Sequence, residues 1–450
     1  MKRATCMALL ALFVAVPALA KVSKEEADKL KTTLMPMGGE KAGNKDGSIP
    51  AWEGGLTTSP ACYKGPPNRV CDPFADDKPL FTITPANVAK YKDKLPPGQL
   101  AMFRKYPDTF KINVYQTRRT AAYPDWIYES TYRNALNGEL ISNGEGVGGA
   151  TESIPFPIPK TGVELVWNHK LRYRGPGATR YNEQAAVTTG GDYNLVKLRE
   201  DVKFIYSTKG IKPEQLNNVS IYFFQVVLQP PRLAGQITLV HETMDQVKEP
   251  RRAWQYNPGQ RRLRRAPNVG YDNPGTGSDG LRTNDQLDVF NGATDRYTWK
   301  VLGKKEMYVP YNSYKIHSNQ YKMRDIVRKG HINMDLPRYE LHRVWVIEGN
   351  VKPSTTHIYA RRVFYADEDS WQIVHADLYD RRGELWRVQA AYPLQAYSER
   401  IFSAAMETSF DLLSGRYLVF SGNNESPETV THELDQSYFD PANVQKQATK

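Results

Sequence analysis

The chain has 450 residues, a formal net charge of +11 and a 40% share of apolar residues. This length suits one large domain or two ordinary ones, and the composition is that of a globular protein. Beyond the first twenty residues, no apolar run approaches the ~18 residues that a transmembrane helix needs, which excludes an integral helical membrane protein.

Residues 1–20 have the three parts of a secretory signal peptide. Lys2 and Arg3 give a positive start, residues 7–16 form an unbroken apolar run, and residues 18–20 read Ala-Leu-Ala, a small-x-small cleavage site. The alternative is a buried N-terminal helix. The pattern predicts export to the periplasm, either free there or peripheral to the outer membrane. A basic exported chain favours anionic lipid or acidic protein partners and makes nucleic acid an unlikely partner, so none is expected.

Residues 21–109 are predicted to form a helical and irregular N-terminal segment. Ser23 and Glu26 have the spacing of a capping box, which predicts a short helix at the start. Residues 36–80 are rich in Gly, Pro and Asp and lack sustained periodicity. Residues 85–105 predict two short helices that are separated by a double proline.

Two cysteines lie in this segment, Cys62 and Cys71, on either side of a Gly-Pro-Pro turn. An oxidising compartment favours their pairing, so we predict a disulfide. Two free thiols or a pair of metal ligands are the alternatives. A metal site would need further ligands, and no histidine lies nearby in the sequence. We therefore predict no metal.

Residues 110–450 are predicted to form an antiparallel β domain. Runs rich in β-branched and aromatic residues occur at 110–117, 163–174, 220–229, 235–244, 339–349, 357–366, 371–380 and 384–392. Turns at 366–370, 380–383 and 257–259 are compact enough for hairpins. Strong helices are expected to be few, and they include 321–329 and 425–437.

The strands follow one another without long helices between them, which favours an antiparallel sheet over βαβ units. We predict a mainly β fold of the α+β class, with a large curved sheet and a few helices. A sheet of this kind must bury one face. A sheet around an apolar cavity, a closed barrel and a filled sandwich all satisfy this requirement.

The sharpest local feature is the segment RRAWQYNPGQRRLRR at 251–265. If Asn257 begins a hairpin turn, arginines from both arms meet near its base. Guanidinium groups bind phosphate and carboxylate in a two-pronged manner, so we predict docking to anionic lipid or to an acidic partner. A solubilising surface that pairs with local acids is the alternative. The predicted docking residues are Arg251, Arg252, Arg261, Arg262, Arg264 and Arg265.

Aromatic residues recur along the predicted strands. Core packing explains most of them, but some are candidates for the lining of an apolar cavity that accepts a lipid- or sterol-like ligand. The predicted lining residues are Trp254, Tyr256, Trp345, Trp371 and Trp386.

No motif of catalysis stands out. Gly275, Gly277 and Gly280 spell GxGxxG, but a proline precedes them and a Thr-Asn-Asp turn follows, so we interpret residues 266–286 as a long polar loop. Two His-Glu pairs, at His241 and His432, lack the second histidine of a zinc helix. We therefore expect no cofactor and no enzymatic activity.

Long strings carry a family resemblance: MPMGGEKAGNKDGSIPAWEGGL (35–56), NPGQRRLRRAP (257–267), SDGLRTNDQLDVFNGATDRYTWKVLGKKEMYVPYN (278–312), PRYELHRVWVIEGNVKP (337–353) and HIYARRVFYADEDSWQI (357–373). They resemble the DUF1329 family of Gram-negative bacteria over nearly the whole mature chain. Members of that family are often labelled outer-membrane lipoprotein-sorting proteins. The label implies a LolA/LolB-like open barrel, in which a curved sheet closed by helices holds acyl chains. The resemblance supplies no catalytic residues.

The resemblance also implies company with RND-type (MMPL-like) transporters and a DUF1302 outer-membrane protein. The function expected from these features is a periplasmic carrier or adaptor for a hydrophobic, lipid- or sterol-like molecule. A scaffold that bridges inner- and outer-membrane proteins and carries nothing is the alternative. A hydrolase with an unrecognised site is the third possibility.

Overall fold

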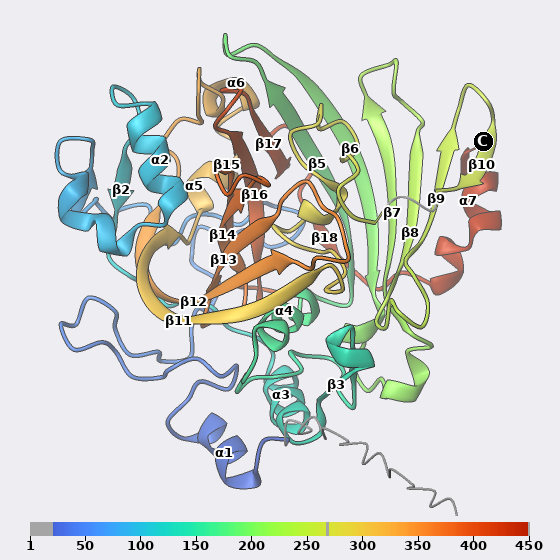
Figure 1. Cartoon of the computed structure of the whole chain (residues 1–450), viewed down its shortest axis with the longest axis horizontal. Helices are drawn as coiled ribbons and strands as arrows, with labels where there is room; N and C mark the ends of the chain where they lie inside the picture. The colour runs from blue at the N-terminus through green and yellow to red at the C-terminus, as the bar shows by residue number, and fades with distance from the viewer. Residues whose placement is uncertain (1–20, 267–269, 449–450) are drawn as a thin grey trace, which may run out of the picture.

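The computed structural model describes residues 21–266 and 270–448. Its main feature is one sheet of 16 strands that contains two antiparallel meanders (Figure 1). The first meander consists of β11 (Tyr297–Pro310), β12 (Tyr339–Val351), β13 (Arg361–Asp367), β14 (Ile373–Tyr379), β15 (Leu385–Ala396), β16 (Ile401–Asp411) and β17 (Tyr417–Gly422). The second consists of β5 (Gly177–Val187), β6 (Tyr193–Phe204), β7 (Val219–Gln229), β8 (Ile237–Thr243), β9 (Arg252–Asn257) and β10 (Arg262–Arg265).

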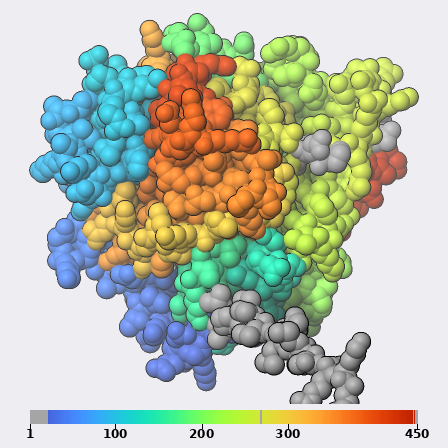
Figure 2. All heavy atoms as spheres, in the orientation of Figure 1, coloured from blue at the N-terminus to red at the C-terminus, as the bar shows by residue number. Residues whose placement is uncertain are grey.

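The two meanders join where β17 pairs antiparallel with β5, with Tyr417 opposite Val187. They lie side by side on one face of the molecule, the first in orange and the second in green to yellow-green (Figure 2). Three short strands complete the main sheet: β1 (Phe81–Ile83), β2 (Ile112–Val114) and β18 (Val430–Thr431). Two others, β3 (Glu139–Ile141) and β4 (Gly146–Gly148), pair with each other in a separate small sheet. Within the described residues the two ends of the sheet do not pair with each other, so the sheet is open. The predicted large curved antiparallel sheet is confirmed.

The helices are short and few. They are α1 (Lys24–Asp28), α2 (Pro97–Lys105), α3 (Asp125–Asn137), α4 (Gly162–Leu171), α5 (Tyr314–His317), α6 (Met323–Ile326) and α7 (Pro441–Ala448), with 3₁₀ turns that include η2 (Val88–Lys94), η6 (Asn284–Gln286) and η7 (Gln436–Phe439). In the described part of the chain, none is long and apolar enough to cross a bilayer. The predicted signal peptide, residues 1–20, lies outside the described residues.

The first meander is packed on both faces. Val388 of β15 belongs to a core that includes Met102 of α2, whereas Ala391 of the same strand belongs to a core with Ile127 of α3 and Val166 of α4. Side chains an odd number of residues apart point to opposite faces of a strand. This half of the sheet is therefore a filled layer between two helical layers.

The second meander is covered differently on its two faces. On one face, Phe439 of η7 stacks on Tyr222 of β7 with ring centroids 5.7 Å apart, and its carbonyl lies 2.9 Å from Nε2 of His241. The helix α7 continues this cover along β8, β9 and β10. The opposite face carries the candidate site described below.

Several local predictions are confirmed. The turns at 366–370 and 380–383 connect β13, β14 and β15, and the turn at Asn257 connects β9 and β10. The short helices η2 and α2 are separated by the double proline, and Ser23 and Glu26 form the predicted capping box of α1.

The prediction of a strand at 163–174 is wrong, because residues Gly162–Leu171 form α4. The Thr161 hydroxyl accepts the amide N–H of Glu164 (3.4 Å), and the Glu164 carboxylate accepts that of Thr161 (2.9 Å). This capping box fixes the start of the helix. The helix is buried on nearly every side, so it lacks the one-sided apolar stripe that marks a surface helix.

Two further helix predictions need correction. Residues 425–437 contain no α-helix; β18 and the start of η7 lie there instead, and α7 begins at Pro441. The helix expected at 321–329 shrinks to the four residues of α6. The segment 21–109 contributes β1 to the sheet edge and packs α2 against β14 and β15. The boundary predicted at 109/110 stays a prediction.

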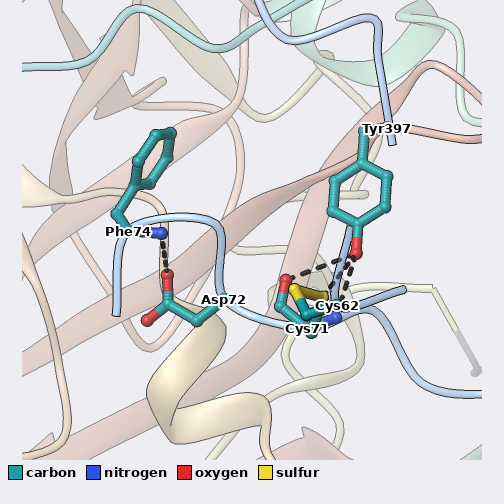
Figure 3. The surroundings of a disulfide bond; sticks show 5 residues. All are labelled: Cys62, Cys71, Asp72, Phe74 and Tyr397. Atoms are coloured by element: carbon teal, nitrogen blue, oxygen red, sulfur yellow. Dashed lines mark hydrogen bonds between the residues drawn. A yellow bond between two sulfur atoms is a disulfide. The ribbon is translucent and has the colours of Figure 1, made fainter. Parts of the chain in front are cut away.

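The predicted disulfide between Cys62 and Cys71 is present, and the loop that it closes lies against Tyr397 (Figure 3). The amide of Cys71 donates to the Tyr397 hydroxyl (3.0 Å), and Tyr63 meets the same ring edge to face with centroids 5.3 Å apart. The disulfide loop, residues 62–71, is therefore docked on the turn that follows β15.

Candidate functional site

A cavity of about 400 Å³ lies against the uncovered face of the second meander. Strands β5 to β8 form its floor, and α4 with residues 284–291 forms its roof. The disulfide loop lies on one side, and parts of β15, β16 and residues 421–431 complete the lining. Small-molecule sites have volumes of roughly 300–1,000 Å³, so this cavity is large enough to hold a ligand.

The floor is apolar at its centre. Val202, Phe223 and Val240 lie opposite one another on β6, β7 and β8, and Phe204 and Ile221 form the next row. All but Val202 remain partly exposed, although they belong to interior strands of the sheet. Apolar side chains in the middle of a sheet are normally covered by packing. Here they face the cavity instead.

A polar row borders the apolar one. Arg180, Glu200 and Gln225 lie opposite one another on β5, β6 and β7. The guanidinium of Arg180 donates to Glu200 (2.5 Å), and the Gln225 amide donates to the other oxygen of that carboxylate (2.7 Å). These contacts compensate the buried charge of Glu200. The floor thus changes from apolar to charged within two residues along each strand, about 7 Å.

The roof depends on Asp288. Its carboxylate accepts hydrogen bonds from Arg172 (2.7 Å) and Arg174 (2.8 Å), which follow α4, and its carbonyl lies 2.8 Å from Nε2 of His169 on that helix. Burial raises the pKa of Asp288, but the two guanidinium groups outweigh it and hold that pKa well below its usual range. One carboxylate therefore joins residues 284–291 to the end of α4.

Glu407 of β16 holds the same roof from the opposite side. Its carboxylate accepts the amide N–H groups of Asp288 (3.2 Å) and Val289 (2.8 Å). Both roof residues have positive φ, 55° and 62°, which is a costly conformation for a β-branched valine. Burial, together with the nearby Asp288 carboxylate, raises the pKa of Glu407 to about 7. The turn keeps its shape because Glu407 accepts both amides.

The disulfide loop forms a side wall with Tyr63, Pro66 and Val70. Arg69 of the same loop donates to the Asn423 side chain (2.6 Å) and to the His317 carbonyl (2.9 Å). The disulfide holds the loop closed, and Arg69 ties it to His317 and Asn423, which are distant from it in sequence.

The five aromatic residues predicted as lining do not line this cavity. Trp371 is fully buried and donates to the Met37 carbonyl (2.7 Å), and Trp386 donates to Asp411 (3.0 Å). Trp345 packs against the core of the first meander. Trp254 and Tyr256 belong to the core under α7, on the other face of the second meander. That lining prediction therefore needs correction, because these rings fill cores.

The predicted arginine group is divided by the structure. Arg251 lines the cavity and pairs with Glu242 (2.5 Å), so it is not part of the outer surface. Arg252 pairs with Glu249 (3.4 Å) and is half-buried. The exposed members are Arg261, Arg262, Arg264 and Arg265 on the β9–β10 hairpin.

Sequence reasoning missed the charged residues of the roof and floor. Arg172 and Arg174 belong to the run 163–174, whose composition favours a strand, and Asp288 follows the long polar loop 266–286. The usable signal is the strand-like run SIYFFQVVLQ. Side chains along a strand point alternately to its two faces, so Ile221 and Phe223 share one face. Which face stays uncovered depends on residues 284–291, which arrive from elsewhere in the sequence.

One other cluster resembles a metal site. His342, Asp367 and Asp369 place a potential ligand atom each within 4.8 Å of one another. Both oxygens of Asp369 accept from Arg119 (2.6 and 2.9 Å), and Nε2 of His342 lies 3.0 Å from Glu340. Burial, with the Asp369 charge, raises the pKa of Asp367 to about 7. Oδ2 of Asp367 accepts from the Ser370 hydroxyl (2.5 Å) and the Tyr311 hydroxyl (3.2 Å), so each of the three residues has a partner within the chain, which fits a structural role in the first meander.

An open, curved antiparallel sheet with a partly apolar cavity defines the class of fold and site. The chain belongs to the DUF1329 family, a family of unknown function whose profile matches residues 82–445. It is 50% identical over 439 residues to the uncharacterized protein PA3922 of Pseudomonas aeruginosa, and the match covers 97% of this chain and 96% of that protein.

Solved structures that are similar share little sequence with this chain. A proposed outer membrane lipoprotein-sorting protein domain from Vibrio parahaemolyticus has a TM-score of 0.44 at 14% identity, covering 63% of this chain and 98% of that one. A DUF1329 family protein from Desulfovibrio piger has a TM-score of 0.41 at 14% identity, covering 60% and 92%. A LolA superfamily protein from Nitrosomonas europaea has a TM-score of 0.38 at 12% identity, covering 63% and 98%.

The role of Asp288 in the roof can be tested by Asp288→Asn. The change leaves the buried guanidinium of Arg172 without a counter-charge, so we expect a loss of about 3 kcal/mol in the free energy of unfolding. Urea unfolding measures it. Asp279→Asn is the matched control, because Asp279 is 67% exposed and pairs with Arg416 at the surface; its expected cost is below ~0.5 kcal/mol. Equal effects of the two changes would contradict the assignment.

Proposed function

We propose that this protein is a periplasmic carrier or adaptor that binds a hydrophobic molecule of lipid- or sterol-like character. The observation that carries the proposal is the uncovered apolar floor formed by Phe204, Ile221, Phe223 and Val240. Leaving such side chains without packing forfeits stability unless a ligand covers them. The cavity volume of about 400 Å³ is consistent with one small amphiphile or part of a larger lipid.

The finer parts of this proposal come from the sequence. The signal-peptide pattern at residues 1–20 supports a periplasmic location. The proposed partners are an RND/MMPL-type transporter and a DUF1302 outer-membrane protein, which the family resemblance implies. A binding role without catalysis fits the absence of known catalytic motifs in the sequence. A bridging scaffold that carries nothing would need no such cavity.

Filling the cavity tests the carrier proposal. Val240→Trp places a large ring over the floor, whereas Leu228→Trp adds the same ring at a position on β7 that is 41% exposed. We expect at least about tenfold weaker binding of Nile red to Val240→Trp, equivalent to ~1.4 kcal/mol, and unchanged binding to Leu228→Trp. Fluorescence titration of detergent-free protein measures both. Equal dye binding by the two variants would argue against the cavity as the ligand site.

The exposed arginines of the β9–β10 hairpin support a second part of the proposal, which is docking to an anionic membrane surface. Arg261, Arg262, Arg264 and Arg265 are exposed on one short hairpin at the open edge of the sheet. Phosphate oxygens accept bidentate hydrogen bonds from guanidinium groups, and several such contacts add up.

Charge reversal tests this docking. Arg262→Glu with Arg264→Glu is expected to weaken binding to phosphatidylglycerol vesicles by about tenfold or more, since each basic residue near an anionic surface contributes ~1 kcal/mol. The melting temperature should not fall, because both side chains are exposed. Arg381→Glu with Arg382→Glu, on the turn between β14 and β15, makes the same charge change elsewhere. Vesicle co-sedimentation that is unchanged in the hairpin variant would reject the docking surface.

A further inference from the structure

We propose that the cavity recognises the oxyanion of an amphiphilic ligand through Arg282, while the apolar body of the ligand lies on the floor of β6, β7 and β8. The inference deepens the proposed function and rests on it. The ligand class is a single anionic head group, carboxylate or phosphate, on an apolar chain. Three observations support the inference: Arg282 is buried in the cavity lining, its Nε has no acceptor among the described residues, and the nearby carboxylates are engaged elsewhere.

Arg282 lies just before η6 and lines the cavity, although its residue is only 4% exposed. Its guanidinium carbon lies 5.4 Å from the centre of the Phe420 ring. Gly275 lies against the guanidinium so closely that a Cβ added to this glycine would be only 2.4 Å from Nη1 of Arg282. The cationic group is therefore held in place by its surroundings rather than free to reach solvent.

Arg282 has almost no polar partner. Within the part of the chain that the structure describes, the guanidinium of Arg282 makes one long hydrogen bond, from Nη1 to the Thr283 carbonyl (3.4 Å), and no carboxylate lies within ion-pair distance of it. Its buried Nε has no acceptor among those residues. An arginine stays charged at physiological pH and offers five N–H donors, so most of its hydrogen-bonding capacity is unused.

The other cations of the lining differ from Arg282. Arg172 and Arg174 pair with Asp288, and Arg180 pairs with Glu200. Arg251 pairs with Glu242, and Lys170 donates to the Gly292 carbonyl (2.8 Å). Each of these groups thus has a partner supplied by the chain.

The acids nearest to Arg282 are already engaged. Glu200 accepts from Arg180, Asn182 and Gln225. Glu407 accepts the two roof amides and the Gln389 side chain (3.1 Å). Neither carboxylate can turn toward Arg282 without leaving other buried donors unsatisfied, which costs more than it gains. A buried guanidinium without a counter-charge is unfavourable, and a bound oxyanion would supply both the charge and the acceptors.

The position of Arg282 relative to the floor defines the rest of the ligand. Burial lowers its pKa, and the charges that oppose this effect are those of Glu407 and Glu200, which places it near the polar row of the floor. The apolar row of Val202, Phe223 and Val240 follows directly along the strands. A molecule with an anionic end and an apolar body therefore matches both rows at once.

The test compares two probes that differ only in the head group, dodecanoate and 1-dodecanol, as competitors of bound Nile red at pH 8, where a carboxylic acid is ionised. The wild-type protein should bind dodecanoate at least about tenfold more tightly than dodecanol. Arg282→Met should bring this preference close to one while leaving Nile red and dodecanol affinities within about threefold. Arg282→Lys keeps the positive charge but cannot bind an oxyanion in a bidentate manner. Its preference for dodecanoate over dodecanol should therefore lie between those of the wild type and Arg282→Met.

Arg416→Met, on a surface ion pair, is the control for loss of one positive charge. Equal wild-type affinity for the acid and the alcohol, or an undiminished preference in Arg282→Met, would overturn the inference while leaving the carrier proposal intact. Failure of the wild type to bind Nile red would instead remove the proposed function on which the inference rests. Dodecyl phosphate serves as a third probe. If it binds more tightly than dodecanoate, the site prefers a phosphate head group; if it binds more weakly, the site prefers a carboxylate.

Discussion

The ion pairs of Asp288 with Arg172 and Arg174 are the constraint on which the site depends. They join the roof segment, residues 284–291, to the end of α4, while Glu407 holds the same segment from β16. If these contacts were absent, the roof would be free to collapse onto the apolar floor and bury it, which the hydrophobic effect favours. Buried charges of this kind contribute little net stability but define one arrangement, and here that arrangement leaves a cavity open.

The two meanders of the sheet differ in how their faces are covered. The first is filled on both faces by helices and loops, and its aromatic residues pack in cores with the density of a protein interior. The second is filled on the face under α7 and open on the other. The cavity floor therefore lies in one half of a continuous sheet, and the filled half supports it. The disulfide loop closes the side of the cavity between the two.

Much of the fold could be predicted because it is encoded locally. Runs rich in β-branched and aromatic residues, bounded by turns, predicted β7, β8 and β12 to β15, and the cysteine pair predicted its own cross-link. The helix α4 could not be recognised from periodicity, since it is buried on almost all sides. The cavity lining was predicted from large aromatics, but Trp371 and Trp345 pack in the first meander's core. A cavity persists where side chains do not meet, and that property depends on segments far apart in the sequence.

In the proposed function, an amphiphile occupies the space between the β6–β8 floor and α4. The most direct measurement is anomalous diffraction from crystals of detergent-free protein soaked with 12-bromododecanoic acid. We expect a bromine peak over Ile221, Phe223 and Val240, with the carboxylate density beside Arg282. Side chains that fill this space in the soaked crystal, or bromine bound only at the outer surface, would contradict it.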